Sequence, residues 1–307
     1  MRVFLIVLLS LLILSLVVLA LYILLNSLVF HSVFSRKGRL RKKSDKNLQK
    51  EKNVEACKEY FSQFKIVSVE SDDRLILRGY FKDNSSDKTA ILIHGFCGSH
   101  YNMIDFAKLF EKRGYNILVI NQRAHGISDG NFTTLGYYEG DDLKAWINFV
   151  TTIREDAKIV LYGISMGGTI VCMNASENCS PNVVLAISDC AFDNAYKIIF
   201  YSLKREGIIL KFFVNNFLRY SKITREVDFK KVDLTGKLKN TKIPMLFVHG
   251  DQDDVVPLEM VYSLSNQVPE YRRQLFISRD AKHIESYKKN PKEFETNIDK
   301  FLTKYNM

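Results

Sequence analysis

The chain has 307 residues, 47% of them hydrophobic and 25% charged, a composition typical of a globular protein with room for one sizeable domain. Its net charge of +10 is concentrated at the N-terminus: residues 1–52 hold ten Lys and Arg against two acidic residues, which leaves 34 basic against 32 acidic residues elsewhere. A nearly neutral folded part argues against a nucleic-acid-binding domain, and five scattered cysteines without a C-x-x-C pair argue against a disulfide framework or a zinc site.

An uncharged run rich in Leu, Ile and Val extends from Val3 to Phe30. About 20 apolar residues in a helix cross the hydrocarbon core of a bilayer, so the run predicts a single-pass transmembrane anchor over residues 1–31. A cleaved signal peptide is one alternative, because Val18-Leu19-Ala20 has the spacing of a cleavage site. That site lies inside the run, however, and the apolar region of a signal peptide is usually about 7–15 residues long. A buried core helix is the other alternative.

Residues 32–55 are predicted to form a basic, solvated and disordered juxtamembrane linker. Seven Lys and Arg lie between Arg36 and Lys46, whereas Arg2 is the one basic side chain before the apolar run. Such a cluster suits anionic lipid headgroups, to which each nearby cation contributes about 1 kcal/mol of binding free energy. By the positive-inside rule the C-terminal part is expected on the cytoplasmic side of the membrane, with the opposite topology as the alternative.

Residues 56–307 are predicted to form one domain, in which short β-rich runs alternate with helical patterns. This alternation is typical of an α/β protein with a mostly parallel central sheet and helices on both faces. Runs at 64–70 and 74–81, joined by the polar turn Ser71-Asp72-Asp73, predict an antiparallel hairpin. Further strands are expected at 89–94, 116–121, 158–163, 183–188, 244–249 and 274–278, and helices at 101–113, 141–153, 166–176, 258–267 and 291–305.

The first parallel strand is followed by a turn with two glycines, His94-Gly95-Phe96-Cys97-Gly98-Ser99. A turn of this kind can leave backbone N–H groups unpaired at the end of the sheet, where they could bind an oxyanion. An ordinary glycine-containing turn between a strand and a helix is the alternative interpretation.

The pentapeptide Gly163-Ile164-Ser165-Met166-Gly167 follows the apolar run at 158–162 and precedes a predicted helix. A serine on a sharp turn between a strand and a helix is held out at the end of the sheet as a nucleophile. Gly163 and Gly167 leave room for the strand and helix to approach each other. The backbone N–H groups of Phe96 and Met166 would then form the oxyanion hole.

More than fifty residues separate the strands at 183–188 and 244–249, far more than a loop needs. We expect a helical cap at about 193–240, over the edge of the sheet where ligands bind in open α/β folds. Whether its apolar side chains line a site or only pack the insertion onto the domain stays open. They recur at helical spacing and are Tyr196, Ile199, Phe200, Leu203, Leu210, Phe213, Phe217 and Leu218.

A serine nucleophile needs a base, and a carboxylate to orient that base. In the chain order Ser, acid, His that accompanies this type of turn, His283 is the one histidine that lies beyond every plausible acid. The acid is expected in the loop after the strand at 244–249, where Asp251, Asp253 and Asp254 are all candidates. These three aspartates lack the spacing of a calcium loop, and no metal or cofactor is expected.

The residues from about Phe64 to Tyr305 resemble the α/β-hydrolase superfamily, in particular the single-span, membrane-anchored serine hydrolases grouped with bem46-like and monoacylglycerol-lipase-like enzymes. Besides the serine pentapeptide, three strings carry the resemblance. They are His94-Gly95-Phe96, the segment Asn121-Gln122-Arg123-Ala124-His125-Gly126-Ile127-Ser128, which is similar to D-x-R-G-H-G-x-S, and His249-Gly250-x-x-Asp253-x-x-Val256-Pro257. Asn121 and Ala124 replace the usual Asp and Gly, a departure expected to affect local packing and not chemistry.

The resemblance implies an α/β-hydrolase fold, Ser165 as nucleophile, His283 as general base and then acid, and Asp253, in preference to its neighbours, as the orienting acid. It also implies a membrane-anchored serine hydrolase that cleaves carboxylic esters, acyl or lipid-like, through an acyl-enzyme. The expected partners are such an ester and the membrane lipids, with no nucleic acid. A serine peptidase of the same fold, and a catalytically silent interaction protein bound to the membrane, are the alternatives.

Overall fold

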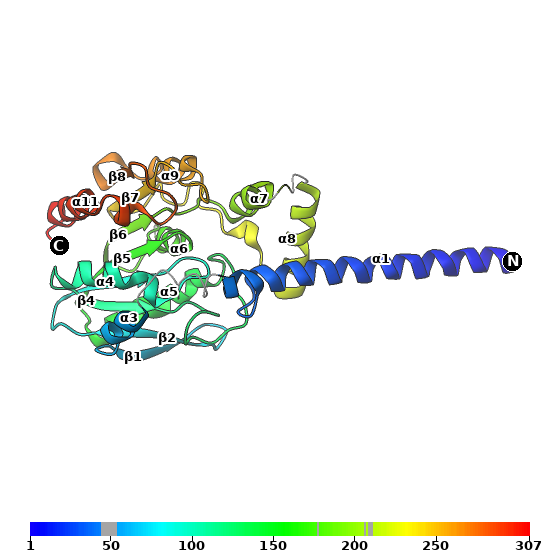
Figure 1. Cartoon of the computed structure of the whole chain (residues 1–307), viewed down its shortest axis with the longest axis horizontal. Coiled ribbons are helices and arrows are strands. Elements are labelled where there is room, and N and C mark those ends of the chain that lie inside the picture. Colours follow the sequence, from blue (N-terminus) through cyan, green and yellow to red (C-terminus); the bar gives the residue numbers. More distant parts are fainter. Residues whose placement is uncertain (44–53, 177, 206, 208–210) are drawn as a thin grey trace.

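The computed structural model is built around one sheet and describes residues 1–43, 54–176, 178–205, 207 and 211–307 (Figure 1). Within these residues, eight strands run in the order β1-β2-β4-β3-β5-β6-β7-β8. The pairs β1–β2 and β2–β4 are antiparallel, and the other neighbours are parallel. The strands are β1 (Lys65–Glu70), β2 (Ile76–Lys82), β3 (Lys88–Ile93), β4 (Asn116–Ile120), β5 (Lys158–Ile164), β6 (Val183–Asp189), β7 (Met245–Gly250) and β8 (Arg273–Ser278).

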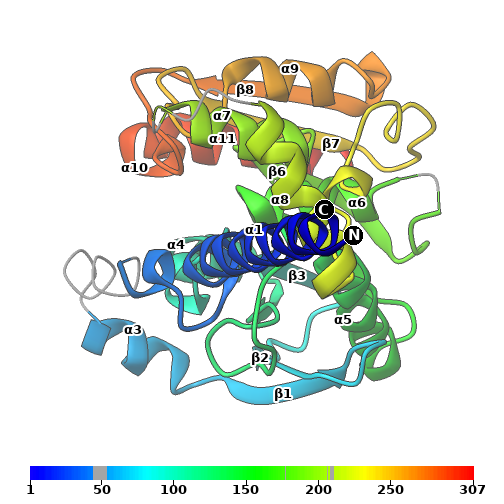
Figure 2. The same cartoon turned by 90° about the vertical axis from the view of Figure 1, so that its right-hand side faces the viewer.

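Helices cover both faces of this sheet, as Figure 2 shows in a view along the N-terminal helix. On one face the apolar sides of α3 (Val54–Phe61), α4 (Ile104–Glu111) and α11 (Pro291–Lys304) are buried. The opposite face is covered by α5 (Glu139–Ile153), α6 (Met166–Asn174) and α9 (Leu258–Ser265). The short elements are η1 (His100–Met103), η2 (Phe229–Lys231), η3 (Glu270–Arg272) and α10 (Ser286–Lys289).

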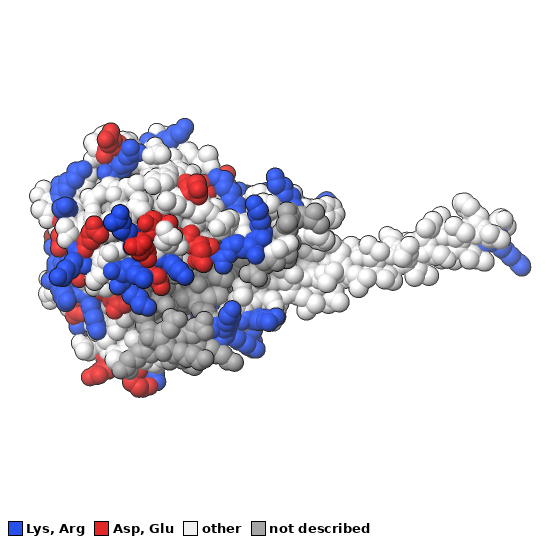
Figure 3. Space-filling model, turned by 45° about the horizontal axis from the view of Figure 1, so that its top comes forward, with Lys and Arg blue, Asp and Glu red and all other residues white. Residues whose placement is uncertain are grey.

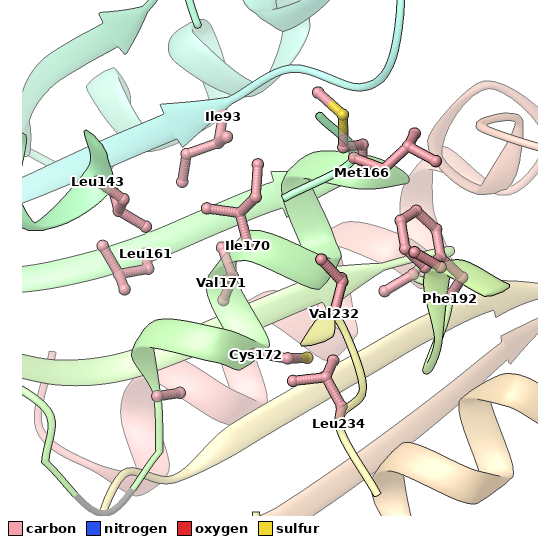
Figure 4. Close-up of a cluster of buried hydrophobic side chains, with 14 of the residues drawn as sticks. Ile93, Leu143, Leu161, Met166, Ile170, Val171, Cys172, Phe192, Val232 and Leu234 are labelled. Atoms are coloured by element: carbon pink, nitrogen blue, oxygen red, sulfur yellow. The ribbon is translucent and has the colours of Figure 1, made fainter. Parts of the chain in front are cut away.

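Helix α6 is the most deeply buried of these elements, because apolar side chains surround it on all sides. Ile170 and Val171 are fully enclosed between β5, α5 and the chain that leads into β7 (Figure 4). A helix that is apolar all round is a core helix and not a surface helix. The turn that precedes α6 is therefore held in a rigid setting.

The predicted α/β fold, with a mostly parallel sheet and helices on both faces, is confirmed. The differences are local. The predicted helix at 101–113 is divided into η1 and α4, and the second strand begins at Ile76 instead of residue 74. Helix α3 was not predicted, because its eight residues offer little periodicity, yet Cys57 and Phe61 are buried beneath it.

The insertion between β6 and β7 contains two helices, α7 (Ala195–Arg205) and α8 (Lys211–Arg225). These helices bury Ile198, Ile199, Val214, Phe217 and Leu218 against the rest of the chain. Phe213, in contrast, points outward and is 56% exposed. Leu210, one of the apolar positions expected in this insertion, lies outside the described residues.

The N-terminal helix α1 (Arg2–Phe34) is, among the described residues, the one helix that is long and apolar enough to cross a membrane. Its C-terminal end packs into the domain. Phe34 is buried with its ring centroid 5.0 Å from that of Phe229, 5.9 Å from that of Phe217 and 6.0 Å from that of Phe96. Phe30 is buried beside it.

The prediction of a solvated linker that begins at residue 32 is therefore wrong for its first residues. Helix α1 continues to Phe34, whose ring is buried, and the segment that follows is hydrogen-bonded to the domain. Arg36 donates its backbone N–H to the carbonyl of Asn131 (2.8 Å) and its Nη1 to the carbonyl of Ser128 (2.6 Å). Arg41 is buried as well. Residues 44–53 of the predicted linker lie outside the described residues.

If the end of α1 is part of the core, Phe34→Ala should lower the free energy of unfolding by about 3–5 kcal/mol, as other truncations of buried aromatic residues do. Phe4→Ala is the matched control, because Phe4 lies in the same helix but is exposed. Thermal unfolding of the full chain in detergent measures both variants. An equal, small change in melting temperature for the two would contradict this packing.

Candidate active site

Ser165 occupies the turn between β5 and α6 with φ +54° and ψ −120°, a backbone conformation that side-chain-bearing residues rarely adopt. The turn is possible because glycines flank it. A Cβ on Gly163 would collide with the backbone of Gly167, and a Cβ on Gly167 would lie 2.8 Å from the carbonyl oxygen of His94. The strand, turn and helix therefore pack backbone against backbone around the serine.

His283 lies in the loop after β8 and reaches across to this serine. Its Nε2 is 2.9 Å from Ser165 Oγ, and its Nδ1 is 2.7 Å from Asp253 Oδ2. A carboxylate can only accept a hydrogen bond, so Nδ1 carries the proton and Nε2 is left to accept from the serine hydroxyl. The three side chains form one continuous chain of hydrogen bonds.

Asp253 is held in place by its own loop. Its Oδ1 accepts the backbone N–H groups of Val255 (2.9 Å) and Val256 (2.8 Å), and its Oδ2 faces His283 and His249. Burial alone would raise the pKa of this carboxyl, but the hydrogen bond from His283 and the backbone donors hold it below its ordinary value. Asp253 is therefore ionised at neutral pH.

Of the three candidate aspartates, the structure brings only Asp253 to His283 among the residues it describes. Asp251 donates its backbone N–H to the carbonyl of Ser278 (3.1 Å), and the backbone carbonyl of Asp254 accepts a hydrogen bond from the Arg205 side chain. Gly250 lets the two loops meet, because a Cβ there would collide with the backbone of Ala281. The loop after β7, which carries Asp253, therefore packs directly against the loop after β8, which carries His283.

The turn after β3 crosses directly over the serine. A Cβ on Gly95 would lie 3.1 Å from Ser165 Cβ, so any larger residue there would press against the serine. The turn is closed by a bond from Gly98 N–H to the carbonyl of Gly95 (3.0 Å). Within the described part of the chain, neither Phe96 nor Met166 has a hydrogen-bond partner for its backbone N–H. Both donors are available at this end of the sheet.

His94 fixes this turn to the neighbouring segment. Its Nδ1 donates to the carbonyl of Gly95 (2.8 Å), and its Nε2 accepts the backbone N–H of Gln122 (3.2 Å). Complete burial lowers the pKa of His94 to about 3, so the ring is neutral and keeps this one tautomer. The histidine of the His94-Gly95-Phe96 string therefore has a structural role.

The segment 121–128 packs against the other side of His94. Arg123 donates to both Asp142 (2.7 Å) and Asp73 (2.9 Å) from a buried position. Ala124 has φ +59°, the left-handed region that favours glycine. An alanine in place of the usual glycine therefore adds backbone strain at this position. Its backbone N–H still donates to the carbonyl of Asp129 (2.8 Å).

Asp189 is a buried acid that the sequence patterns did not single out. It ends β6, its backbone carbonyl accepts the N–H of Ser165 (2.8 Å), and its Oδ2 accepts the hydroxyl of Tyr162 (3.0 Å). Burial raises the pKa of this carboxyl to about 7. A single Asp after a strand carries no distinctive sequence signal, so only the spatial arrangement identifies it.

Comparison with known proteins agrees with this architecture. Residues 89–205 match a family described as alpha/beta hydrolase fold. The uncharacterised protein YqkD of Bacillus subtilis is 26% identical over 75% of this chain and 76% of its own length, and bem46 of Schizosaccharomyces pombe is 24% identical over 67% and 66%. An esterase of Pyrococcus furiosus superposes with a TM-score of 0.67 and 26% identity, over 80% of this chain and 93% of the esterase.

The fold, the family match and these relatives agree on one class of protein. The chain has the α/β-hydrolase fold, and bem46 is among the proteins to which it is similar.

The buried Asp189 predicts a pH-dependent stability. The ordinary pKa of an aspartate carboxyl is near 4, whereas that of Asp189 in the folded chain is about 7. Between these two pH values the unfolded chain has lost the proton and the folded chain retains it. The free energy of unfolding therefore falls as pH rises, by at most about 1.4 kcal/mol per pH unit. Asp189→Asn removes this contribution while its amide oxygen still accepts from Tyr162. The melting temperature of the variant relative to the wild type should therefore rise from pH 4 to pH 7. A constant difference across this range would contradict the assignment.

Proposed function

We propose that this protein is a membrane-anchored serine hydrolase that cleaves carboxylic esters, acyl or lipid-like, through an acyl-enzyme. The observation that carries the proposal is the hydrogen-bonded chain from Ser165 through His283 to Asp253. It is supported by the backbone N–H groups of Phe96 and Met166, which have no partner among the described residues. This combination meets the needs of acyl transfer: a nucleophile, a base, a group that orients the base, and donors for the oxyanion.

In the first half of the reaction, Ser165 Oγ attacks the ester carbonyl carbon while His283 Nε2 takes the hydroxyl proton. The negative charge that develops on the carbonyl oxygen is stabilised by the N–H groups of Phe96 and Met166. Collapse of this intermediate breaks the bond to the alcohol, which leaves with the proton from His283, and the acyl group remains on the serine.

In the second half, a water molecule gives a proton to His283 Nε2 and attacks the acyl carbon. The second tetrahedral intermediate collapses, the carboxylic acid leaves, and the proton returns to Ser165 Oγ. Throughout, Asp253 stays ionised and stabilises the imidazolium that forms in each half. Its lowered pKa supports this role.

We also propose that α1 anchors the enzyme as a single membrane span, with the domain from residue 56 onward on the cytoplasmic side. The support is the apolar helix itself and the seven Lys and Arg between Arg36 and Lys46. The proposed catalysis and the proposed anchoring together describe an ester hydrolase that works next to a bilayer.

Ser165→Ala should abolish hydrolysis of a short p-nitrophenyl ester and labelling by a fluorophosphonate probe, because the attacking oxygen is removed. Ser202→Ala is the matched control, since Ser202 is exposed in α7, and it should retain both signals. Undiminished turnover by the Ser165 variant would refute the proposal, and turnover of peptide substrates in preference to esters would favour a peptidase.

The acid is tested by a set of three neighbouring substitutions. Asp253→Asn should lower kcat by about 10³–10⁴-fold, since His283 loses the partner that fixes its tautomer. Asp251→Asn and Asp254→Asn serve as matched controls in the same loop and should keep kcat at the wild-type order of magnitude. Steady-state hydrolysis of the same ester measures all three. Comparable losses in the three variants would mean that the loop acts only as a structural unit.

A further inference from the structure

The outermost element of the domain, at the end where α1 leaves it, is the helix α8 (Figure 1). It runs across α1 and contacts it directly. Tyr22 donates its hydroxyl to the carbonyl of Asn216 (2.9 Å), and its ring lies edge-on to that of Tyr220 at 6.5 Å. The position of α8 along α1 is therefore fixed at the level of Tyr22.

This level coincides with the expected edge of a bilayer. Residues 2–21 of α1 are continuously exposed, and Tyr22 is the first residue that the domain partly covers. At about 1.5 Å per residue this free stretch is about 30 Å long, the thickness of a bilayer hydrocarbon core. If residues 2–21 fill the hydrocarbon, α8 lies in the plane of the interface, where tyrosines are favoured.

The outward side of α8 has the composition of an interfacial helix. Phe212 and Ile223 are 71% and 68% exposed, and their spacing places them on one side of the helix together with the basic Arg219. Phe213 is exposed next to them. Single exposed apolar side chains such as Ile66 are common on protein surfaces, but three of them lie together on this one helix.

The charge of the same helix fits an anionic lipid surface. Residues 211–225 contain no Asp or Glu and four basic side chains, Lys211, Arg219, Lys222 and Arg225. Lys222 pairs with Asp228 (2.8 Å) and Arg225 lies over the ring of Phe30, so Lys211 and Arg219 are the cations that best suit a lipid headgroup. Figure 3 shows further Lys and Arg near the base of α1, and beyond them a length of helix without charged side chains up to its far tip. Exposed apolar side chains interspersed with cations are typical of helices that lie in the headgroup region of a bilayer.

We propose that the outward strip of α8, formed by Phe212, Phe213 and Ile223, is a second membrane-binding surface that inserts into the headgroup region of a bilayer with anionic lipids. The proposal rests on the proposed anchoring by α1 but not on the proposed catalysis. It places the cap in the interface, next to esters that are themselves held in the bilayer. The aromatic contacts from Phe217 through Phe34 to Phe96 join this surface to the turn over the serine.

Tryptophan quenching in vesicles tests this surface with the full-length protein. The single native Trp146 is completely buried, so a tryptophan introduced at the surface dominates any quenching by lipid. Phe212→Trp and Ile223→Trp are compared in vesicles of phosphatidylcholine and phosphatidylglycerol, with and without bromine on the acyl chains near the headgroup. We expect brominated lipid to reduce the emission of the added tryptophan at least twofold.

Two controls separate this surface from the anchor. Leu14→Trp lies in the free part of α1 and should be quenched, whereas Ile66→Trp lies on the exposed strand β1 and should not. Quenching at Leu14→Trp without quenching in α8 would overturn the second surface and leave the anchor intact. No quenching at Leu14→Trp would refute the anchor and the α8 surface together. A blue-shifted but unquenched tryptophan in α8 would mean that another protein copy covers the strip, which also overturns the proposal.

Discussion

The site depends on one strained residue, Ser165, whose left-handed backbone conformation is maintained by backbone packing on every side. Conformations of this kind cost of order 1–3 kcal/mol and persist only where the surroundings over-determine them. Here the N–H of the serine is bonded to Asp189, and glycines at 95, 163 and 167 bring three backbone segments to within contact of it. Because α6 is buried on all sides, the turn cannot relax without disturbing the core. The position of the serine hydroxyl, within hydrogen-bond distance of His283, is thus a consequence of the packing of the sheet.

A second constraint is that buried polar groups around the serine are stabilised by hydrogen-bond partners. His94 and Gln122 bond each other and the turn over the serine, and Asp253 is bonded by its own loop before it meets His283. Each of these groups keeps a single protonation state: His94 is neutral because it is buried, and Asp253 is ionised because it has donors. The contrast with the raised pKa of Asp189 shows that burial without enough donors has the opposite effect on a carboxyl. Of these two acids near the serine, Asp253 is therefore ionised at neutral pH, whereas the pKa of Asp189 lies close to neutral pH.

Much of the fold could be predicted from the sequence, because parallel strands are apolar runs and the serine turn has a local pattern of small residues. The choice of Asp253 among three neighbouring aspartates needed a family resemblance. Which of them reaches His283 depends on how the loop after β7 packs against the loop after β8, where Gly250 approaches Ala281. This contact between distant segments leaves no pattern in the local sequence. Helix α3 is too short for periodicity to reveal it. The docking of Phe34 could not be predicted for a different reason. A helix that is apolar all round has no polar face that marks which side meets protein and which meets lipid.

The burial of Phe30 and Phe34 gives α1 a structural role in the domain itself. A buried aromatic ring removes about 150–250 Å² from water, which at about 25 cal/mol per Å² amounts to several kcal/mol as an upper bound, so Phe30 and Phe34 hold α1 firmly against the domain. A flexible tether would leave the domain free to rotate above the membrane, whereas this contact fixes the direction of the sheet relative to α1. Since Phe34 also touches the ring of Phe96, the position of the anchor and that of the turn over the serine are mechanically linked. In the proposed membrane-bound hydrolase, α1 would consequently be part of the scaffold of the candidate active site, and its depth in the bilayer would determine which face of the cap meets lipid.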